Sequence, residues 1–221
     1  GEDPEKVFIT GCPSIDLAER VQGSMDNGFD PFAAYAGVGN RFDARDGYMV
    51  VMQHPVTTEY RDSASQIHET ISAVRTLNQP TFWFWPNVDA GSDQISKGLR
   101  QFREAGETSQ IYFFKNMTPE DFLRLLAGAR CLVGNSSAGI REASYLGLPV
   151  VNIGNRQQGR ERARNVIDVG YNAAEIVEAT EKHLANGRYP SSPLYGDGKA
   201  GERIAQILAR VPLTVEKRIA Y

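Results

Sequence analysis

Short β-branched or aromatic runs alternate with longer segments of helical period along most of this 221-residue chain. Most of the short runs are apolar throughout, which is expected of strands that are covered on both faces. This alternation is typical of a parallel sheet with helices on either side. The sequence therefore predicts an α/β protein with a doubly wound, Rossmann-like parallel sheet.

The expected strands cover residues 7–11, 48–53, 81–85, 111–115, 131–134 and 150–153. The expected helices cover residues 15–25, 62–77, 93–104, 119–129, 139–146, 173–185 and 200–209. One stretch, 23–47, breaks this rhythm because it is rich in Gly, Asp and Asn. It is predicted to be a long surface excursion with at most one short helix, around 32–36.

Composition excludes several classes of protein. The chain has 24 Lys and Arg against 27 Asp and Glu, for a net charge of −3, so it lacks the basic field typical of nucleic-acid binding. Cys12 and Cys131 lie far apart without CxxC spacing, which argues against a disulfide scaffold and against a metal site. The acidic N-terminus and the lack of an apolar run of membrane-spanning length disfavour secretion and a membrane span. We therefore expect a cytoplasmic protein with neither a nucleic-acid nor a membrane partner.

Polar clusters follow four of the expected strands. In an open parallel sheet, ligands bind beyond the carboxyl ends of the strands, so these clusters are the candidate site. They are Gln53-His54-Pro55, Pro86-Asn87-Val88-Asp89, Lys115-Asn116-Met117 and Gly134-Asn135-Ser136-Ser137.

The cluster GNSSAG, which begins at Gly134, is the most informative of the four. Small residues let a ligand approach the backbone, and free N–H groups, helix N-termini and the hydroxyls of Ser136 and Ser137 suit a phosphate. Glu142, about one helical turn later, would repel phosphate but could accept hydrogen bonds from a ribose diol. The alternative is an ordinary serine N-cap with Glu142 exposed.

His54 could donate to a diphosphate or transfer a proton near neutral pH, or it could be a loop imidazole satisfied by a backbone carbonyl. Asn87 and Asp89 could equally form a helix-capping turn. Arg156, followed by Arg160, Arg162 and Arg164, could clamp phosphate oxygens. A solvated helix face remains the alternative for Arg162 and Arg164.

Long stretches of the sequence resemble the UDP-N-acetylglucosamine 2-epimerase family, most closely its hydrolysing branch, which makes precursors of sialic and legionaminic-type acids. The matching text is GCPSID from Gly11, MQHPVTTEY from Met52, PNVDAGS from Pro86 and the block GNSSAGIREASYLGLPVVNIGNRQQGRERARNVIDV from Gly134. YPSSPLYGDGKA and the terminal EKRIAY also fit.

The resemblance implies a glycosyltransferase-B-like fold of two Rossmann-like lobes, of which residues 1–221 look like the C-terminal nucleotide-binding lobe. The N-terminal lobe would be absent, residues 7–11 would be the first strand of the second lobe, and residues 212–221 would pack on the missing lobe. The intact protein would form a homo-oligomer.

The resemblance also implies roles for individual residues. His54 would lie at the diphosphate and reaction centre as the catalytic residue of this lobe, Ser136 and Ser137 would bind phosphate, and Glu142 would bind the ribose. Arg156 and Asn87 would be further nucleotide contacts, and the loop with Asn116 and Met117 would lie against uracil. Asn116 replaces the histidine of some relatives.

The implied reaction removes the C2 proton of the sugar and expels UDP to give a glucal. Water then adds at C1 and a proton at C2, which releases free N-acetylmannosamine, or its 2,4-diacetamido analogue, and UDP. No metal or redox cofactor is implied, and the only ligand is UDP or a UDP-N-acetyl amino sugar. The alternatives are a non-hydrolysing 2-epimerase, a UDP-sugar glycosyltransferase, and a lobe that binds UDP without catalysing a reaction.

Overall fold

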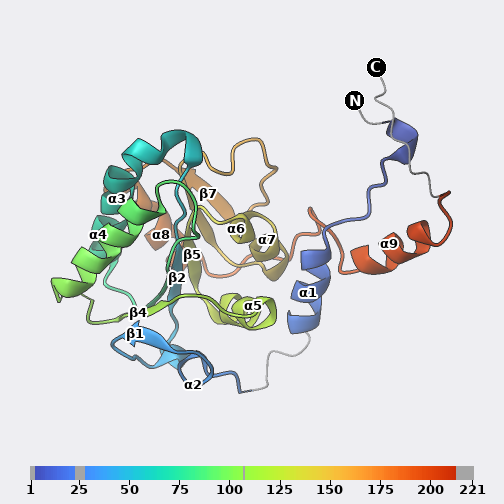
Figure 1. Ribbon diagram of the computed structural model, residues 1–221. Coiled ribbons are helices and arrows are strands. Elements are labelled where there is room, and N and C mark those ends of the chain that lie inside the picture. The colour runs from blue at the N-terminus through green and yellow to red at the C-terminus, as the bar shows by residue number, and fades with distance from the viewer. Residues whose placement is uncertain (1–2, 23–27, 107, 213–221) are drawn as a thin grey trace.

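The computed structural model describes residues 3–22, 28–106 and 108–212. Its centre is a seven-stranded sheet with the order β1-β4-β3-β2-β5-β6-β7 (Figure 1). The strands are β1 (Gly37–Gly39), β2 (Met49–Met52), β3 (Thr81–Phe84), β4 (Ile111–Phe114), β5 (Cys131–Gly134), β6 (Val150–Ile153) and β7 (Val166–Val169). All neighbours are parallel except β1, which pairs antiparallel with β4 at one edge. The six parallel strands have the order of a Rossmann fold, which confirms the predicted fold class.

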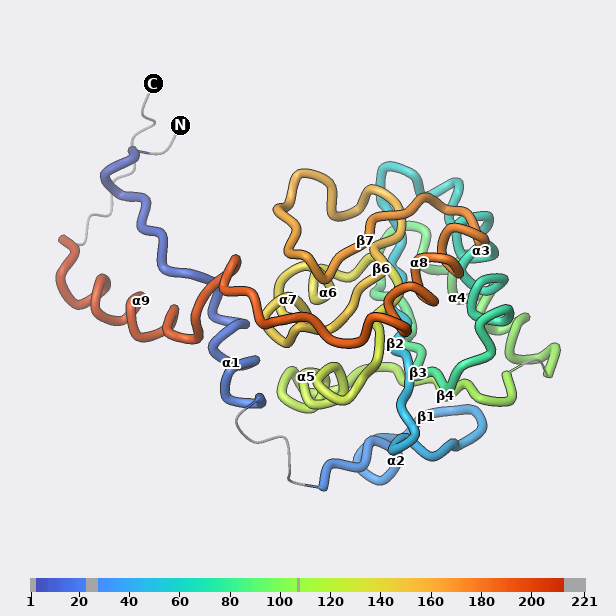
Figure 2. The backbone as a smooth tube through the Cα atoms, turned by 180° about the vertical axis from the view of Figure 1, so that it is seen from behind, coloured from blue at the N-terminus to red at the C-terminus, as the bar shows by residue number. Residues whose placement is uncertain are grey.

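Helices cover both faces of the sheet (Figures 1 and 2). One face carries α3 (Ser63–Leu77), α4 (Ser92–Glu104) and α8 (Ala173–Asn186), and the other carries α1 (Pro13–Gln22), α5 (Pro119–Gly128), α6 (Ser137–Ile140) and α7 (Glu142–Leu146). Neighbouring strand residues point to opposite faces, so Val50 packs in one hydrophobic cluster and Val51 in the other. This double burial explains why the strands are apolar throughout.

The remaining elements are short or peripheral. They are α2 (Pro31–Ala34), α9 (Ala200–Leu208) and three 3₁₀ turns, η1 (Pro4–Lys6), η2 (Ala44–Asp46) and η3 (Thr57–Asp62). Within the described parts of the chain, no helix has both the length and the apolar character needed to cross a membrane.

The predicted first strand, residues 7–11, is wrong. This segment belongs to no sheet and is open to solvent, with Ile9 98% exposed. β-branched residues favour a strand only where a neighbouring strand supplies hydrogen bonds and packing, and here the neighbour is an irregular segment. The first parallel strand of the sheet is therefore β2, which begins at Met49.

Two strands were not predicted. β1 lies inside the 23–47 excursion, where Gly37 permits close pairing, since a Cβ there would lie 2.3 Å from Cε1 of Tyr112. β7 is a half-buried edge strand with mixed polar and apolar residues, so it lacks the apolar signature of the central strands. The short helix predicted within the excursion is α2, which Asp30 caps by accepting a hydrogen bond from the Phe32 N–H at 2.9 Å. Residues 23–27 lie outside the described part.

The helix predicted over 139–146 is two short helices, α6 and α7, which meet at Arg141. Arg141 has φ −94° and ψ −72°, away from ideal helical values, although its N–H still donates to the Ser137 carbonyl at 3.0 Å. The helix predicted over 15–25 begins two residues earlier, at Pro13, and is described as far as Gln22. Of the predicted tail 212–221, residues 213–221 are not among the described residues.

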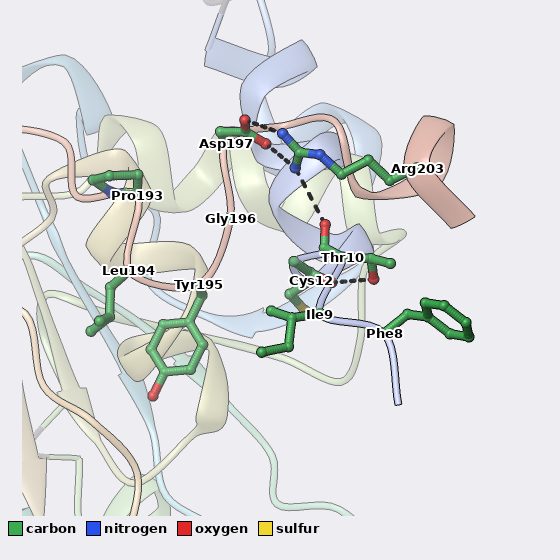
Figure 3. Close-up of a pocket in the computed structure, with 11 residues that line it drawn as sticks. Phe8, Ile9, Thr10, Cys12, Pro193, Leu194, Tyr195, Gly196, Asp197 and Arg203 are labelled. Carbon is green, nitrogen blue, oxygen red and sulfur yellow. Dashed lines mark hydrogen bonds and ion pairs between the residues drawn. The ribbon is translucent and has the colours of Figure 1, made fainter. Parts of the chain in front are cut away.

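The N-terminal segment and α9 lie side by side, apart from the sheet (Figures 1 and 2). The Asp16 carboxylate of α1 caps α9, since it accepts hydrogen bonds from the N–H groups of Ala200 at 2.9 Å and Gly201 at 2.6 Å. Arg203 of α9 binds both carboxylate oxygens of Asp197 and donates to the Thr10 carbonyl at 3.3 Å (Figure 3). These contacts tie together two segments that lie almost the whole chain apart in sequence.

Candidate active site

The centre of the candidate site is the point where the strand order reverses, between β2 and β5. His54 follows β2 and Asn135 follows β5, and both are buried. Gly134 ends β5 with φ 140°. A Cβ at this position would lie 2.1 Å from the Met52 carbonyl oxygen, which is too close for any side chain. The close approach of the two strand ends therefore depends on a glycine at this position.

The His54 ring is held in one orientation. Its Nδ1 accepts a hydrogen bond from the Asn87 backbone N–H at 3.2 Å, so in the neutral ring the proton is on Nε2. Burial lowers the pKa of His54 to about 4, the positive charge of Arg156 also lowers it, and Asp89 opposes this shift. At neutral pH the ring is therefore a neutral hydrogen-bond donor. The hydrogen bond that fixes the ring therefore comes from a backbone N–H at Nδ1, not from the backbone carbonyl that the alternative interpretation names.

This low pKa predicts an acid sensitivity that the His54→Gln variant lacks. An unfolded histidine has a pKa of about 6.5, so the unfolded state takes up the proton first as the pH falls. Through His54 the native state therefore loses stability between about pH 6.5 and pH 4, and this histidine contributes no further loss below that range. We expect the unfolding free energy to fall by about 3 kcal/mol more in the wild type than in His54→Gln between pH 7 and pH 3.5, because a difference of one in pKa corresponds to about 1.4 kcal/mol.

Urea unfolding curves at a series of pH values measure this difference. His68→Gln is the matched control, because His68 is an exposed residue of α3, on a helix that covers one face of the sheet. Parallel stability curves for the wild type and His54→Gln would contradict the prediction.

The two serines of the GNSSAG cluster, the predicted phosphate loop, differ in their contacts. The Ser136 Oγ accepts a hydrogen bond from the Ala138 N–H at 3.3 Å and so caps α6, as the alternative for this loop predicts. The Ser137 Oγ accepts from Nη2 of Arg141 at 3.5 Å, which leaves its own hydrogen free to donate. With four residues in α6, any helix dipole here is small, so an anion bound at this loop would be held mainly by hydroxyl and backbone donors.

Glu142 is buried, with its side chain 9% exposed, so the exposed alternative for this residue is wrong. Its Oε1 lies 3.4 Å from Nη2 of Arg141. Its Oε2 is buried and has no hydrogen-bond partner among the residues that the structure describes. A buried carboxylate oxygen without a partner is costly, and a ligand with hydroxyl donors would satisfy it.

Arg156 reaches the same centre from the loop after β6. Its Nη1 donates to the Asn135 carbonyl at 3.3 Å, and it lines a pocket of about 420 Å³ together with Pro55, Asp89 and Asn155. The other arginines of the predicted cluster are elsewhere. Arg162 pairs with Asp168 at 3.1 Å, and Arg160 and Arg164 are exposed.

The loop after β4 is largely occupied by its own contacts. The Asn116 Oδ1 accepts from the Met117 N–H at 2.9 Å, and the Met117 side chain is buried in the core. The Met117 N–H is therefore not free for a ligand in this structure. Asn87 is exposed, and its backbone N–H, rather than its side chain, contacts His54.

A wider pocket, of about 620 Å³, lies where the N-terminal segment crosses residues 193–197 (Figure 3). Phe8, Ile9, Tyr195 and Arg203 are among the residues that line it. No residue predicted for the site lines it, so the polar cluster at the strand ends remains the candidate active site.

A family model described as UDP-N-acetylglucosamine 2-epimerase matches residues 1–209. The chain belongs to the UDP-N-acetylglucosamine 2-epimerase family. The resemblance seen in the sequence is thereby confirmed.

Two curated relatives of this epimerase-family chain are enzymes. The chain is 32% identical over 213 residues to a Legionella pneumophila protein described as UDP-N,N'-diacetylbacillosamine 2-epimerase (hydrolyzing). This match covers 96% of this chain and 54% of that relative. The chain is also 28% identical over 211 residues to a Neisseria meningitidis UDP-N-acetylglucosamine 2-epimerase. This match covers 94% of this chain and 53% of that relative. The chain thus spans about half the length of these relatives.

A solved structure shares the fold. The Methanocaldococcus jannaschii UDP-GlcNAc 2-epimerase, in complex with UDP-GlcNAc and UDP, matches with a TM-score of 0.68 at 16% identity. The match covers 94% of this chain and 56% of that one.

Two residues of this site, Asn135 and Arg141, were given no role on the basis of the sequence. Asn135 lies inside the GNSSAG cluster, and its position after a central strand was a signal that could have marked it. Arg141 donates to Ser137 and pairs with Glu142, and also contacts Cys12 at the start of α1. Nothing in its local sequence distinguishes it from a solvated helix residue.

Proposed function

We propose that this chain is the C-terminal nucleotide-binding lobe of a hydrolysing UDP-sugar 2-epimerase. The observation that carries the proposal is the buried carboxylate oxygen of Glu142 that has no partner among the described residues, about one turn from Ser137, at the switch point of a Rossmann sheet. Such a site suits a nucleoside diphosphate. The hydrolysing relative, at 32% identity, supports the choice of reaction.

Each part of UDP has a proposed contact. Glu142 accepts hydrogen bonds from the ribose hydroxyls, which gives its free oxygen a partner. Ser137 and Arg156 donate to the diphosphate, and His54 adds the N–H of its Nε2. Uracil lies toward the loop of Asn116 and Met117, where backbone groups other than the Met117 N–H read its edge.

In the proposed reaction, the C2 proton leaves the sugar as the bond between C1 and the UDP oxygen breaks, which gives a 2-acetamidoglucal and UDP. Water then adds its oxygen to C1, and a proton returns to C2 from the opposite face, so the products are the free epimeric sugar and UDP. The groups that remove and return the C2 proton belong to the N-terminal lobe.

This lobe stabilises the leaving group. Negative charge grows on the diphosphate as the C1–O bond breaks, and donors held in a buried site stabilise that charge without having to reorient. Because the pKa of His54 is about 4 in the free protein, its proposed role is a hydrogen bond rather than full proton transfer. A bound diphosphate raises this pKa, because it is negatively charged.

A second candidate is the non-hydrolysing epimerase, because the Neisseria relative is a UDP-N-acetylglucosamine 2-epimerase. A product assay on the full-length enzyme separates the two reactions. Free N-acetylmannosamine or its 2,4-diacetamido analogue, formed with UDP, supports hydrolysis, and accumulation of the epimeric UDP-sugar without free sugar contradicts it.

Calorimetric titration of this chain with UDP tests the binding site itself. We expect UDP to bind and the chain alone to give no turnover, because one wall of the proposed cleft is contributed by the other lobe. Absence of UDP binding would overturn the site, and turnover by the chain alone would overturn the division of labour between lobes.

Replacing Ser137 by alanine is expected to weaken UDP binding by about 1–3 kcal/mol, because a hydroxyl that donates to a charged phosphate oxygen is lost. The same titration measures the change. Ser109→Ala is the control, because Ser109 is exposed and lies just before β4, at the amino-terminal end of this strand and so away from the site. Equal affinities for wild type and Ser137→Ala would remove Ser137 from the site.

A further inference from the structure

The Asn135 side chain forms a two-way hydrogen-bond pair with the backbone of His54. The Asn135 Oδ1 accepts from the His54 N–H at 2.7 Å, and its Nδ2 donates to the His54 carbonyl at 2.8 Å. Asn135 is completely buried. A side-chain amide presents one acceptor and two donors, so it can satisfy both polar groups of a single residue at once.

The Asn135 backbone makes further contacts with neighbouring strand ends. Its N–H donates to the Met52 carbonyl at 3.1 Å. Its carbonyl accepts from Nε2 of Gln157 at 2.8 Å and from Nη1 of Arg156 at 3.3 Å. One residue therefore connects the loop after β5 to the end of β2 and to the loop after β6.

We propose that Asn135 is a positioning residue that holds His54 and Arg156 at the spacing needed to bind a diphosphate between them. The link to the diphosphate rests on the proposed function, whereas the positioning of the His54 ring does not. This role requires a short side chain with both an acceptor and a donor. Aspartate accepts but cannot donate to the His54 carbonyl, and glutamine adds a methylene in a fully buried position.

The His54 ring reports on this arrangement. Its Nδ1 accepts from the Asn87 N–H, and the charged groups that act on it are Arg156 and Asp89. If Asn135 holds the His54 backbone in place, replacing Asn135 lets that backbone move. The His54 ring then loses its hydrogen bond from the Asn87 N–H, and the distance between the ring and Arg156 changes. Both changes alter the ¹⁵N chemical shifts and the titration of the ring.

The experiment compares wild type, Asn135→Asp and the control Asn165→Asp. Asn165 is also a buried asparagine that donates to one backbone carbonyl, that of Leu148 at 2.7 Å, and its hydrogen bonds within the described part of the chain involve none of the predicted site residues. Two-dimensional ¹⁵N NMR of the ring nitrogens gives the tautomer and titration of His54, and His54→Gln assigns its signals among the three histidines. Calorimetry gives the UDP affinity of each variant.

For the wild type we expect an Nε2–H tautomer. For Asn135→Asp we expect a UDP affinity at least about tenfold weaker and a His54 titration midpoint raised by about one pH unit or more, because a nearby carboxylate favours the charged ring. Asn165→Asp is expected to be less stable than wild type but to keep the His54 signals and the UDP affinity. If Asn135→Asp does not fold, Asn135→Ser replaces it, with the same expected loss of affinity and a change in the ring ¹⁵N shifts.

An Nδ1–H tautomer in the wild type would overturn the proposal. So would an Asn135 variant that folds and keeps both the wild-type His54 signals and the wild-type affinity. If the wild type binds no UDP, the proposed function fails, and the ring signals of the Asn135 variant alone then decide whether Asn135 positions His54.

Discussion

Replacing Glu142 by glutamine is expected to weaken UDP binding by about 2–3 kcal/mol while the free protein keeps its stability. The variant preserves the shape of the side chain but removes the charge that strengthens hydrogen bonds to the ribose hydroxyls. Stability changes little, because Oε2 is buried and has no described partner, and because the ion pair of Oε1 with the partly exposed Arg141 at 3.4 Å contributes little. Calorimetric titration with UDP and urea unfolding together measure the two effects.

Glu178→Gln is the matched control for the loss of one negative charge. Glu178 is an exposed residue of α8, a helix that packs on the face of the sheet away from the phosphate loop. Its variant should bind UDP as the wild type does. A Glu142→Gln variant that binds UDP normally would disprove the ribose role, and one that unfolds readily would show that Glu142 is structural.

Replacing Gly134 by alanine is expected to destabilise the protein by about 3–5 kcal/mol, which is more than most single substitutions cost. Two costs combine here. A φ of 140° strains any residue with a Cβ, and that Cβ would overlap the Met52 carbonyl oxygen at 2.1 Å. Thermal or urea unfolding measures the loss.

Gly159→Ala separates strain from overlap. Gly159 also has a positive φ, 80°, but a Cβ there would have no atom of the described residues within 4 Å. We expect this variant to lose only the part that comes from backbone strain, about 1 kcal/mol. Equal losses for both variants would show that the close contact between β5 and β2 contributes nothing.

The central strands were predictable because burial on both faces leaves a continuous apolar signature, as in β2 and β5. Residues 7–11 carry a similar signature but have no strand to pair with, and pairing is a property of the whole fold. β7 was missed for the opposite reason, because an edge strand needs few apolar residues. Sequence thus predicts apolar segments more reliably than it predicts their partners.

The candidate site was predictable at the level of strand ends. Once a parallel sheet is expected, His54, Ser137 and Arg156 fall at its carboxyl edge whatever the details of packing. The burial of Glu142 and the hydrogen bonds of Asn135 and Arg141 depend on how α6 and α7 break at Arg141. The local sequence contains no signal for that break.

The hydrogen bonds between His54 and Asn135 join residues 81 positions apart in the sequence. The intervening chain forms β3 and β4 and their helices on one side of β2, while β5 docks on the other side. Contacts that close so long a loop form late, after local structure has reduced the entropy cost. Nucleotide-binding competence should therefore appear only when the sheet has closed at its centre, which makes ligand binding during refolding a kinetic probe of that final docking step.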